Sequence, residues 1–204
     1  MLKGMLAVIL VLSAVCGISL AEEDAVTSAT LAVDRLPAVD ETESSILVVF
    51  FSPGDTVRAA AFAVAGTLSA ELFEIEPAEP YTKDDLNYFN SKARSMTEMA
   101  DKNARPEIVS LPENLDRYDT VLLGYPIWGG QAPRIISTFL ESVDLSGKTV
   151  IPFCTSNSSG IGSSAKNLHS LTGGSVIWTD GVRIPKGSTE EEIRNLAEAL
   201  IPEE

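Results

Sequence analysis

The chain has 204 residues, enough for one domain with extensions, and its 45% hydrophobic and 22% charged content is typical of globular proteins. Its 29 acidic and 15 basic side chains give a formal net charge of -14, so its surface repels nucleic acid and anionic lipid and favours solubility or a basic partner. The composition excludes a collagen-like or low-complexity chain.

Residues 1–21 have the pattern of a secretory signal peptide. Lys3 supplies a positive start, the stretch from Leu6 to Leu20 is almost wholly apolar, and small residues precede a cut after Ala21. The stretch is short for a membrane-spanning helix. We therefore expect cleavage and export to the periplasm or the extracellular space. Two alternatives would attach the chain to a membrane by its N-terminus: an uncleaved anchor, or a lipoprotein that carries its lipid on Cys16.

Residues 22–45 are polar and acidic without a sustained hydrophobic period, which is typical of a flexible tether. The folded domain is therefore expected at residues 46–204. Signal cleavage would leave Cys154 as the only cysteine, so no internal disulfide could form even in an oxidising compartment. We interpret Cys154, at the end of an apolar run, as a core residue.

Apolar runs alternate with helix-forming stretches along this domain. Continuous apolar runs such as Ile46–Phe51 indicate strands that are covered on both faces. The sequence predicts strands at 46–51, 72–76, 118–125, 149–154 and 175–182. It predicts helices at 57–70, 162–171 and 189–201, one that begins at Pro133, and one or two within 81–102, starting near Thr82 and Ser91. Segment 81–102 is longer than a plain crossover, so we expect an excursion beside the ligand-binding edge.

Strict alternation of strands and helices implies parallel strands joined by right-handed crossovers. The expected fold is α/β, a three-layer α/β/α sandwich around a five-stranded parallel sheet. For the order of its strands we take 2-1-3-4-5, a common order of doubly wound sheets, which alternation alone does not determine. In that order the first and third strands flank the switch point, where ligands bind outside the carboxyl ends of the strands. The loops 52–56, 125–130 and 155–160 should converge there.

Each loop has a functional and a plain structural interpretation. The first offers hydroxyls, Gly54 and a following helix N-terminus, which can hold a phosphate without any lysine, or it is a simple turn with Asp55 or Thr56 as N-cap. The second presents Trp128 as a platform for a flat ring or as a cover for the sheet edge. The third, rich in hydroxyls and glycine, suits a polar ring edge or is a solvated loop. Three such loops on one edge strengthen the functional interpretation.

Several other site classes are disfavoured by the residues. The single histidine, His169, lies in a polar stretch of a predicted helix and is expected at the surface. No cluster of His and Cys has metal-ligand spacing, and no GxxxxGKS/T or GxGxxG pattern follows a strand. The sequence therefore argues against a zinc enzyme, a hydrolytic triad, a P-loop NTPase and a dinucleotide-binding Rossmann domain.

A set of motifs, in order, resembles the flavodoxin-like family, whose members bind FMN non-covalently. The resemblance extends from about Ile46 to about Gly181, and its most specific parts are Gly124-Tyr-Pro-Ile-Trp128, Pro152-Phe-Cys-Thr-Ser156 and Ser159-Gly-Ile-Gly162. By that resemblance the first loop holds the FMN phosphate, the second faces the isoalloxazine ring, the third binds the ring edge or ribityl chain, and Tyr81 borders the same cavity. The implied FMN contacts are Ser52, Gly54, Asp55, Thr56, Val57, Pro126, Ile127, Trp128, Gly129, Thr155, Ser156, Asn157, Ser159 and Gly160.

The first loop departs from the family pattern S-x-S/T-G-N-T followed by a basic residue. Here the sequence is Ser52-Pro-Gly-Asp-Thr-Val-Arg58. Omitting one residue aligns Gly54-Asp55-Thr56 with G-N-T and keeps a usable loop. Without the gap, Asp55 replaces the glycine and a carboxylate lies near the phosphate, at a cost on the order of a few kcal/mol. Gly129 also stands where relatives often carry a second tryptophan.

The leading hypothesis is an exported FMN protein that transfers electrons or reduces a small acceptor and docks to a redox partner with a basic surface. The flavin supplies the redox chemistry, so no catalytic side chain is expected. The alternative is a flavodoxin-like domain that has lost FMN and serves as a binding or structural module. A weaker third option, an NAD(P)H-dependent quinone or nitro reductase, would need a nicotinamide site that the sequence does not locate.

Overall fold

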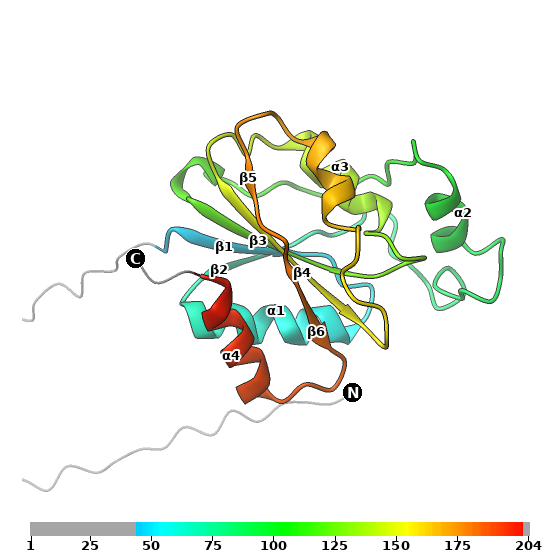
Figure 1. Ribbon diagram of the computed structural model, residues 1–204. Coiled ribbons are helices and arrows are strands. Elements are labelled where there is room, and N and C mark those ends of the chain that lie inside the picture. Colours follow the sequence, from blue (N-terminus) through cyan, green and yellow to red (C-terminus); the bar gives the residue numbers. More distant parts are fainter. Residues whose placement is uncertain (1–43, 202–204) are drawn as a thin grey trace, which may run out of the picture. The chain divides into compact units, whose positions relative to one another are not determined.

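The computed structural model describes residues 44–201, so the predicted signal peptide and all of the predicted tether except Ser44 and Ser45 lie outside the described residues. Five parallel strands pair in the order β2-β1-β3-β4-β5, as predicted, and β6 also pairs with β4 (Figure 1). The strands are β1 (Ile46–Phe50), β2 (Glu71–Glu74), β3 (Thr120–Pro126), β4 (Thr149–Ser156), β5 (Ile177–Trp178) and β6 (Val182–Pro185). The α-helices among the described residues are α1 (Asp55–Leu68), α2 (Arg94–Ala100), α3 (Arg134–Ser142) and α4 (Glu190–Leu200).

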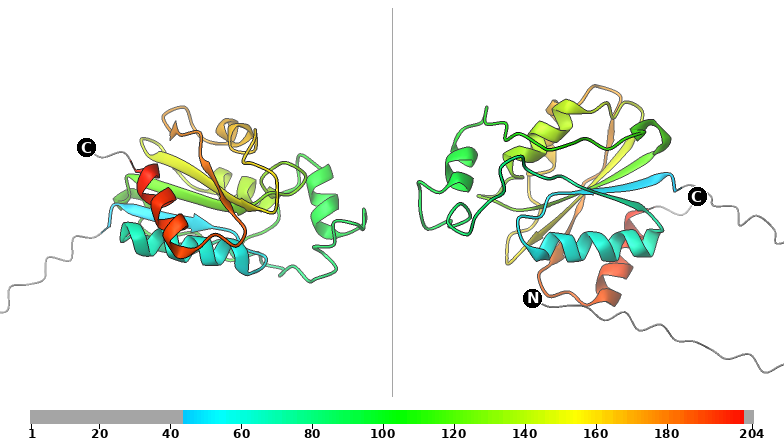
Figure 2. Two further views of the ribbon diagram at one scale, coloured as in Figure 1. Left: turned by 60° about the horizontal axis from the view of Figure 1, so that its bottom comes forward. Right: turned by 180° about the vertical axis from the view of Figure 1, so that it is seen from behind.

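Alternate side chains of the strands enter two separate hydrophobic cores. On β1, Leu47 and Val49 pack with α3, whereas Val48 and Phe50 pack with α1 and α4. Figure 2 shows these helices on opposite faces of the sheet. This period of two explains why the central strands have unbroken apolar runs, and it confirms the three-layer α/β/α sandwich.

Two of the predicted helices are replaced by shorter structure. Residues 83–86 form only turns. The Thr82 hydroxyl accepts from the backbone N–H of Asp85 at 3.2 Å, and the Asp85 carboxylate accepts from the backbone N–H of Thr82 at 2.8 Å. Local side-chain bonds of this kind compete with continued helical bonding. Residues 162–165 are turns, and the 3-10 helix η3 covers only Lys166–Leu171. There the Ser164 hydroxyl donates to the carbonyl of Ile161 at 2.6 Å, which favours a turn.

The predicted strand 175–182 is divided into β5 and β6 at Gly181. This glycine has φ +70°, and a Cβ there would lie 2.5 Å from the carbonyl oxygen of Pro152. Beyond the break, β6 runs parallel to β4 with Pro185 beside Ser156. The end of β6 therefore adds a further segment to the carboxyl edge of the sheet, which the sequence did not predict.

Other features agree with the sequence. Helix α3 begins at Arg134 with Pro133 as its N-cap, one residue later than predicted. Helix α4 has the predicted capping box, formed by Thr189 and Glu192. Cys154 is fully buried, and burial raises the pKa of its thiol to about 11. No helix within residues 44–201 is long and apolar enough to cross a membrane.

Candidate functional site

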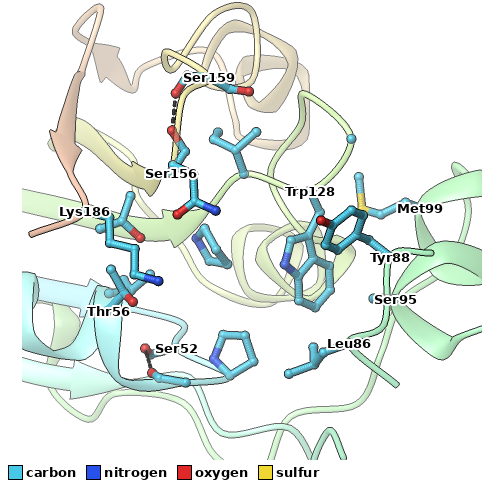
Figure 3. Close-up of a pocket in the computed structure, with 18 of the residues that line it drawn as sticks. Ser52, Thr56, Leu86, Tyr88, Ser95, Met99, Trp128, Ser156, Ser159 and Lys186 are labelled. Atoms are coloured by element: carbon cyan, nitrogen blue, oxygen red, sulfur yellow. Dashed lines mark hydrogen bonds between the residues drawn. The ribbon is translucent and has the colours of Figure 1, made fainter. Parts of the chain in front are cut away.

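A cavity of about 620 Å³ opens at the carboxyl edge of the sheet, within the usual size range of small-molecule and cofactor sites. The three predicted loops form most of its wall, and segment 86–99 and the turn after β6 complete it (Figure 3). The predicted residues that line it are Ser52, Gly54, Thr56, Val57, Pro126, Ile127, Trp128, Gly129, Thr155, Ser156, Asn157 and Ser159. The structure does not bring Asp55 and Gly160 to the cavity.

Asp55 faces solvent although its neighbours line the cavity. It is the first residue of α1, its side chain is fully exposed, and its carboxylate lies 3.5 Å from Nη1 of Arg58. Arg58 also reaches Glu74, with 3.1 Å from Nε to Oε2. The loop therefore keeps both charges, the acidic one and the basic one, directed away from the cavity.

Ser52 shapes the first loop instead of offering a free hydroxyl. Its Oγ accepts a hydrogen bond from the backbone N–H of Arg58 at 3.0 Å and donates to the carbonyl of Gly54. The first N–H groups of a helix have no acceptor within the helix. Among the described residues, none accepts from the N–H of Thr56, the N–H of Val57 or the Thr56 hydroxyl. These three donors, at the positive end of α1, suit an anion.

The second loop turns tightly after Trp128. Trp128 and Gln131 exchange two backbone hydrogen bonds of 2.9 and 3.0 Å, and both central residues, Gly129 and Gly130, have positive φ of 56° and 79°. Positive φ at both central positions is the pattern of a type I′ turn and strongly favours glycine. The fold therefore gives a physical reason for glycine at position 129, where a tryptophan would be strained.

Trp128 is held from behind by a cluster of packed side chains. Its ring meets those of Phe51 and Tyr81 edge to face, with centroids 5.8 and 5.5 Å apart. The Tyr81 hydroxyl donates to Glu98 at 2.6 Å, and the Arg94 guanidinium lies 4.2 Å above the tyrosine ring. Burial first, and then Glu98, raise the pKa of Tyr81, so the phenol stays protonated. Tyr81 thus supports Trp128 and does not line the cavity.

The third loop is fixed by Arg183 on β6. Its Nη2 donates to the carbonyl oxygens of Ser156 and Asn157 at 3.2 and 3.0 Å. The Ser156 hydroxyl donates within the loop to the carbonyl of Ser159. The carbonyl of Thr155 accepts from the N–H of Ile127 at 3.3 Å, which links the second and third loops. The loop edge at the cavity is therefore preorganised.

Comparisons with known proteins agree with this geometry. The flavodoxin family model matches residues 45–200. The chain belongs to the flavodoxin family. A crystal structure from Bacteroides eggerthii, named a "putative flavoprotein", is 42% identical, covers 76% of this chain and 96% of its own, and has a TM-score of 0.70. Its counterpart from Bacteroides uniformis is 39% identical, covers 76% and 98%, and has a TM-score of 0.71.

A more distant structure, a flavoprotein from Lactobacillus acidophilus in complex with FMN, shares the fold at 20% identity. It covers 72% of this chain and 96% of its own, with a TM-score of 0.54. No curated protein matches the chain.

The cavity has lining residues that sequence reasoning missed. The expected excursion after β2 is present at the cavity, but its contributing residues were not identified. The additional lining residues are Pro53, Leu86, Tyr88, Ser95, Met96, Met99, Ser158 and Lys186. Apolar side chains at 86, 88, 96 and 99 in an otherwise polar segment were an available signal. The position of Lys186 depends on the break at Gly181, which the sequence pattern did not reveal.

The cavity thus has two chemically different ends. The aromatic end comprises Leu86, Tyr88, Met99 and Trp128, and the helix end comprises Gly54, Thr56, Val57 and Lys186. Outside the cavity, His169 is exposed and stacks on Trp178 with ring centroids 4.7 Å apart, which confirms its predicted surface position. Within residues 44–201, no group of three or more His, Cys, Asp or Glu side chains could hold a metal ion.

Proposed function

We propose that this flavodoxin domain binds FMN non-covalently and uses it to transfer electrons or to reduce a small acceptor. The observation that carries the proposal is the division of one cavity into an aromatic end and a helix end. FMN has the same division, because a flat ring system is joined through a ribityl chain to a phosphate. The cavity volume of about 620 Å³ suits a cofactor of this kind.

The residues present fit FMN in named roles. Trp128, supported by Phe51 and Tyr81, would stack on the isoalloxazine ring, opposite the apolar wall of the excursion. Asn157 and the backbone of the third loop would bind the polar edge of the ring. The N–H groups of Thr56 and Val57 and the Thr56 hydroxyl would bind the phosphate. Bound FMN would supply the redox chemistry, and the protein would bind it, orient it and limit the access of water.

The relatives support this assignment. Two Bacteroides proteins of about the same length as this domain, at 42% and 39% identity, are each named a "putative flavoprotein". The Lactobacillus acidophilus protein of the same fold was solved with FMN bound. Membership of the flavodoxin family favours FMN over other cofactors with a flat ring.

Titration of the purified protein with FMN tests the proposal. We expect tight binding with quenched flavin fluorescence and a shifted absorbance spectrum, because the ring would be stacked on Trp128. A well-folded protein that is colourless after excess FMN has been removed, and that leaves flavin fluorescence unchanged in the titration, would contradict the proposal. It would instead support the alternative of a flavin-free binding module.

That alternative was suggested by the Pro53-Gly54-Asp55 sequence of the first loop. The carboxylate of Asp55 was expected to repel a phosphate in one of the two alignments. Because its side chain is fully exposed and paired with Arg58, the expected repulsion at the cavity is largely removed. The geometry therefore favours a flavin-binding domain over a flavin-free one.

Export is the remaining part of the proposal. Residues 1–21 carry the signal-peptide pattern, and the net charge of -14 suits a redox partner with a basic surface. Mass spectrometry of protein isolated from a host that exports it should give an N-terminus at Glu22. An intact Met1 in a soluble cytoplasmic fraction would contradict export.

A further inference from the structure

Among the described residues that line the cavity, Lys186 alone carries a charge. The other lining residues are neutral, and they include no aspartate, glutamate, arginine or histidine. The sign of this charge is opposite to the formal net charge of the chain, which is -14. A single positive charge in a neutral cavity indicates a ligand with a negative charge.

The fold places Lys186 at the helix end of the cavity. Strand β6 pairs in parallel with β4 and ends at Pro185, so residue 186 emerges at the carboxyl edge of the sheet. Figure 3 shows the Lys186 side chain extending toward Thr56, on the same side of the cavity as Ser52. Its amine therefore lies near the three unengaged donors at the start of α1.

Nearby cations are already engaged, whereas Lys186 is not. Arg58 pairs with Glu74 and Asp55, and Arg183 holds two carbonyls of the third loop. In the part of the chain that the structure describes, Lys186 has no ion pair and no hydrogen bond. Its ammonium is thus available to a ligand.

We propose that Lys186 binds the phosphate of the flavin and makes the cavity selective for FMN over riboflavin. This inference rests on the proposed function. The first loop has only part of the usual donor set, because the Ser52 hydroxyl is engaged with Gly54 and with the N–H of Arg58. A lysine ammonium supplies the missing donor as a charge-assisted hydrogen bond, which is stronger than a neutral one.

The phosphate is the part of FMN that this lysine suits best. At neutral pH a phosphate monoester carries close to two negative charges. Helix N–H groups and the helix dipole offset part of that charge, and a nearby ammonium offsets more. Riboflavin has the same ring and ribityl chain but no phosphate, so an interaction at Lys186 would favour FMN alone.

The test measures the dissociation constants of FMN and of riboflavin for the full-length protein and three variants. Lys186→Met keeps the length of the side chain and removes its charge, and Lys186→Arg keeps the charge. Lys166→Met is the matched control, because Lys166 is exposed on η3 and does not line the cavity. Each titration is repeated at low and at high salt.

We expect Lys186→Met to weaken FMN binding by about tenfold, which corresponds to about 1.4 kcal/mol. Riboflavin affinity should stay unchanged, and Lys186→Arg and Lys166→Met should bind FMN nearly as the wild type does. Salt should weaken FMN binding less in Lys186→Met than in the wild type, because one screened attraction is missing. Circular dichroism of each apoprotein checks that the fold is retained.

Three results would overturn the inference about Lys186, and each can be distinguished from a result that rejects FMN binding itself. Equal losses for FMN and riboflavin would show a structural role for Lys186. An unchanged FMN constant in Lys186→Met would show a solvated lysine without a role in binding. A wild type that binds both flavins equally would show that the cavity does not select for the phosphate. A wild type that binds neither flavin would reject the proposed function itself.

Discussion

The two ends of the cavity are built in different ways. The aromatic end depends on packed side chains from distant segments, with Trp128 resting on Phe51 and Tyr81. The helix end depends on backbone N–H groups at the start of α1 and on Lys186. A substitution at the aromatic end should therefore affect both ligand binding and core packing. A substitution of Lys186 at the helix end should change the ligand preference with little effect on the fold. Substitutions at the two ends should have separable effects on flavin affinity and on stability.

The largest effect is expected for Trp128→Ala. Loss of a stacking platform is worth about 1–3 kcal/mol, by analogy with bases stacked on aromatic side chains. FMN and riboflavin should therefore both bind about tenfold to a hundredfold more weakly. The free energy of unfolding should also fall, because Phe51 and Tyr81 lose a packing partner. Fluorescence titration with both flavins and urea denaturation measure the two effects.

Trp178→Ala is the matched control for this prediction. Trp178 lies on β5, donates from Nε1 to the Thr172 hydroxyl at 3.1 Å and does not line the cavity. Its loss should lower stability and leave flavin affinity unchanged. Unchanged affinity in Trp128→Ala, or an equal loss in both variants, would remove the special role of the aromatic end.

The difference between the ends also explains how much of the site could be predicted. Unbroken apolar runs gave the sheet, and the loops that follow them gave most of the cavity, including Trp128. These features depend on local pattern and on the general rule that ligands bind at the carboxyl edge. The parallel sheet and the position of Trp128 therefore needed no knowledge of side-chain contacts, whereas the order of the strands was taken from the common doubly wound arrangement.

The missed features depend on tertiary contacts. Asp55 was assigned to the site because the first loop resembles the phosphate loop of the family, whereas the structure makes it the first residue of α1 and turns its side chain to solvent. Lys186 was missed because Gly181 breaks the last strand against Pro152, a contact between segments far apart in the chain. The apolar wall of the excursion was missed although its apolar side chains stand out in a polar segment, because nothing local in the sequence indicates that they face the cavity. In each case the orientation of the side chain is decided by contacts that a local sequence pattern does not specify.

Two glycine substitutions, one at each end of the cavity, compare the backbone requirements of the two ends in the protein without flavin. Gly129 has φ 56°, where an L residue costs about 1–2 kcal/mol, so Gly129→Ser should lower the free energy of unfolding by about 1 kcal/mol. Gly54 is extended, with φ -155°, and nothing lies near its Cβ position. Gly54→Ser should be neutral or slightly stabilising, because serine is a good N-cap for α1.

Urea denaturation of both variants, without flavin, measures the difference. The same chemical change is made at both ends, so side-chain polarity and size cancel in the comparison. Equal destabilisation at the two positions would contradict the type I′ turn as the source of the glycine requirement.

The smallest predicted effect concerns the anchoring of the excursion that carries the apolar wall. After α2, Arg105 binds Glu141 on α3 with two hydrogen bonds of 2.6 and 2.7 Å. These hydrogen bonds lower the pKa of Glu141 from its usual value. Because the pKa of the folded state is depressed, this pair stabilises the fold above the unfolded pKa, and the contribution is lost as pH falls through the folded pKa.

Glu141→Gln should therefore lower the free energy of unfolding at pH 7 by less than about 1 kcal/mol, since the pair is partly exposed and screened by solvent. The difference from the wild type should shrink as the pH falls below the usual glutamate pKa of about 4.3 and on through the lower pKa of the folded state, because the wild-type carboxyl group then becomes protonated as well. Glu113→Gln is the control, because Glu113 is exposed and has no hydrogen bond or ion pair among residues 44–201. Urea denaturation across this pH range tests the direction of the pH dependence, and a stability difference that grows in acid would contradict it.

Because Glu141 lies away from the helix end, the ratio of FMN to riboflavin affinity should stay constant in Glu141→Gln. This measurement separates anchoring of the excursion from recognition of the phosphate.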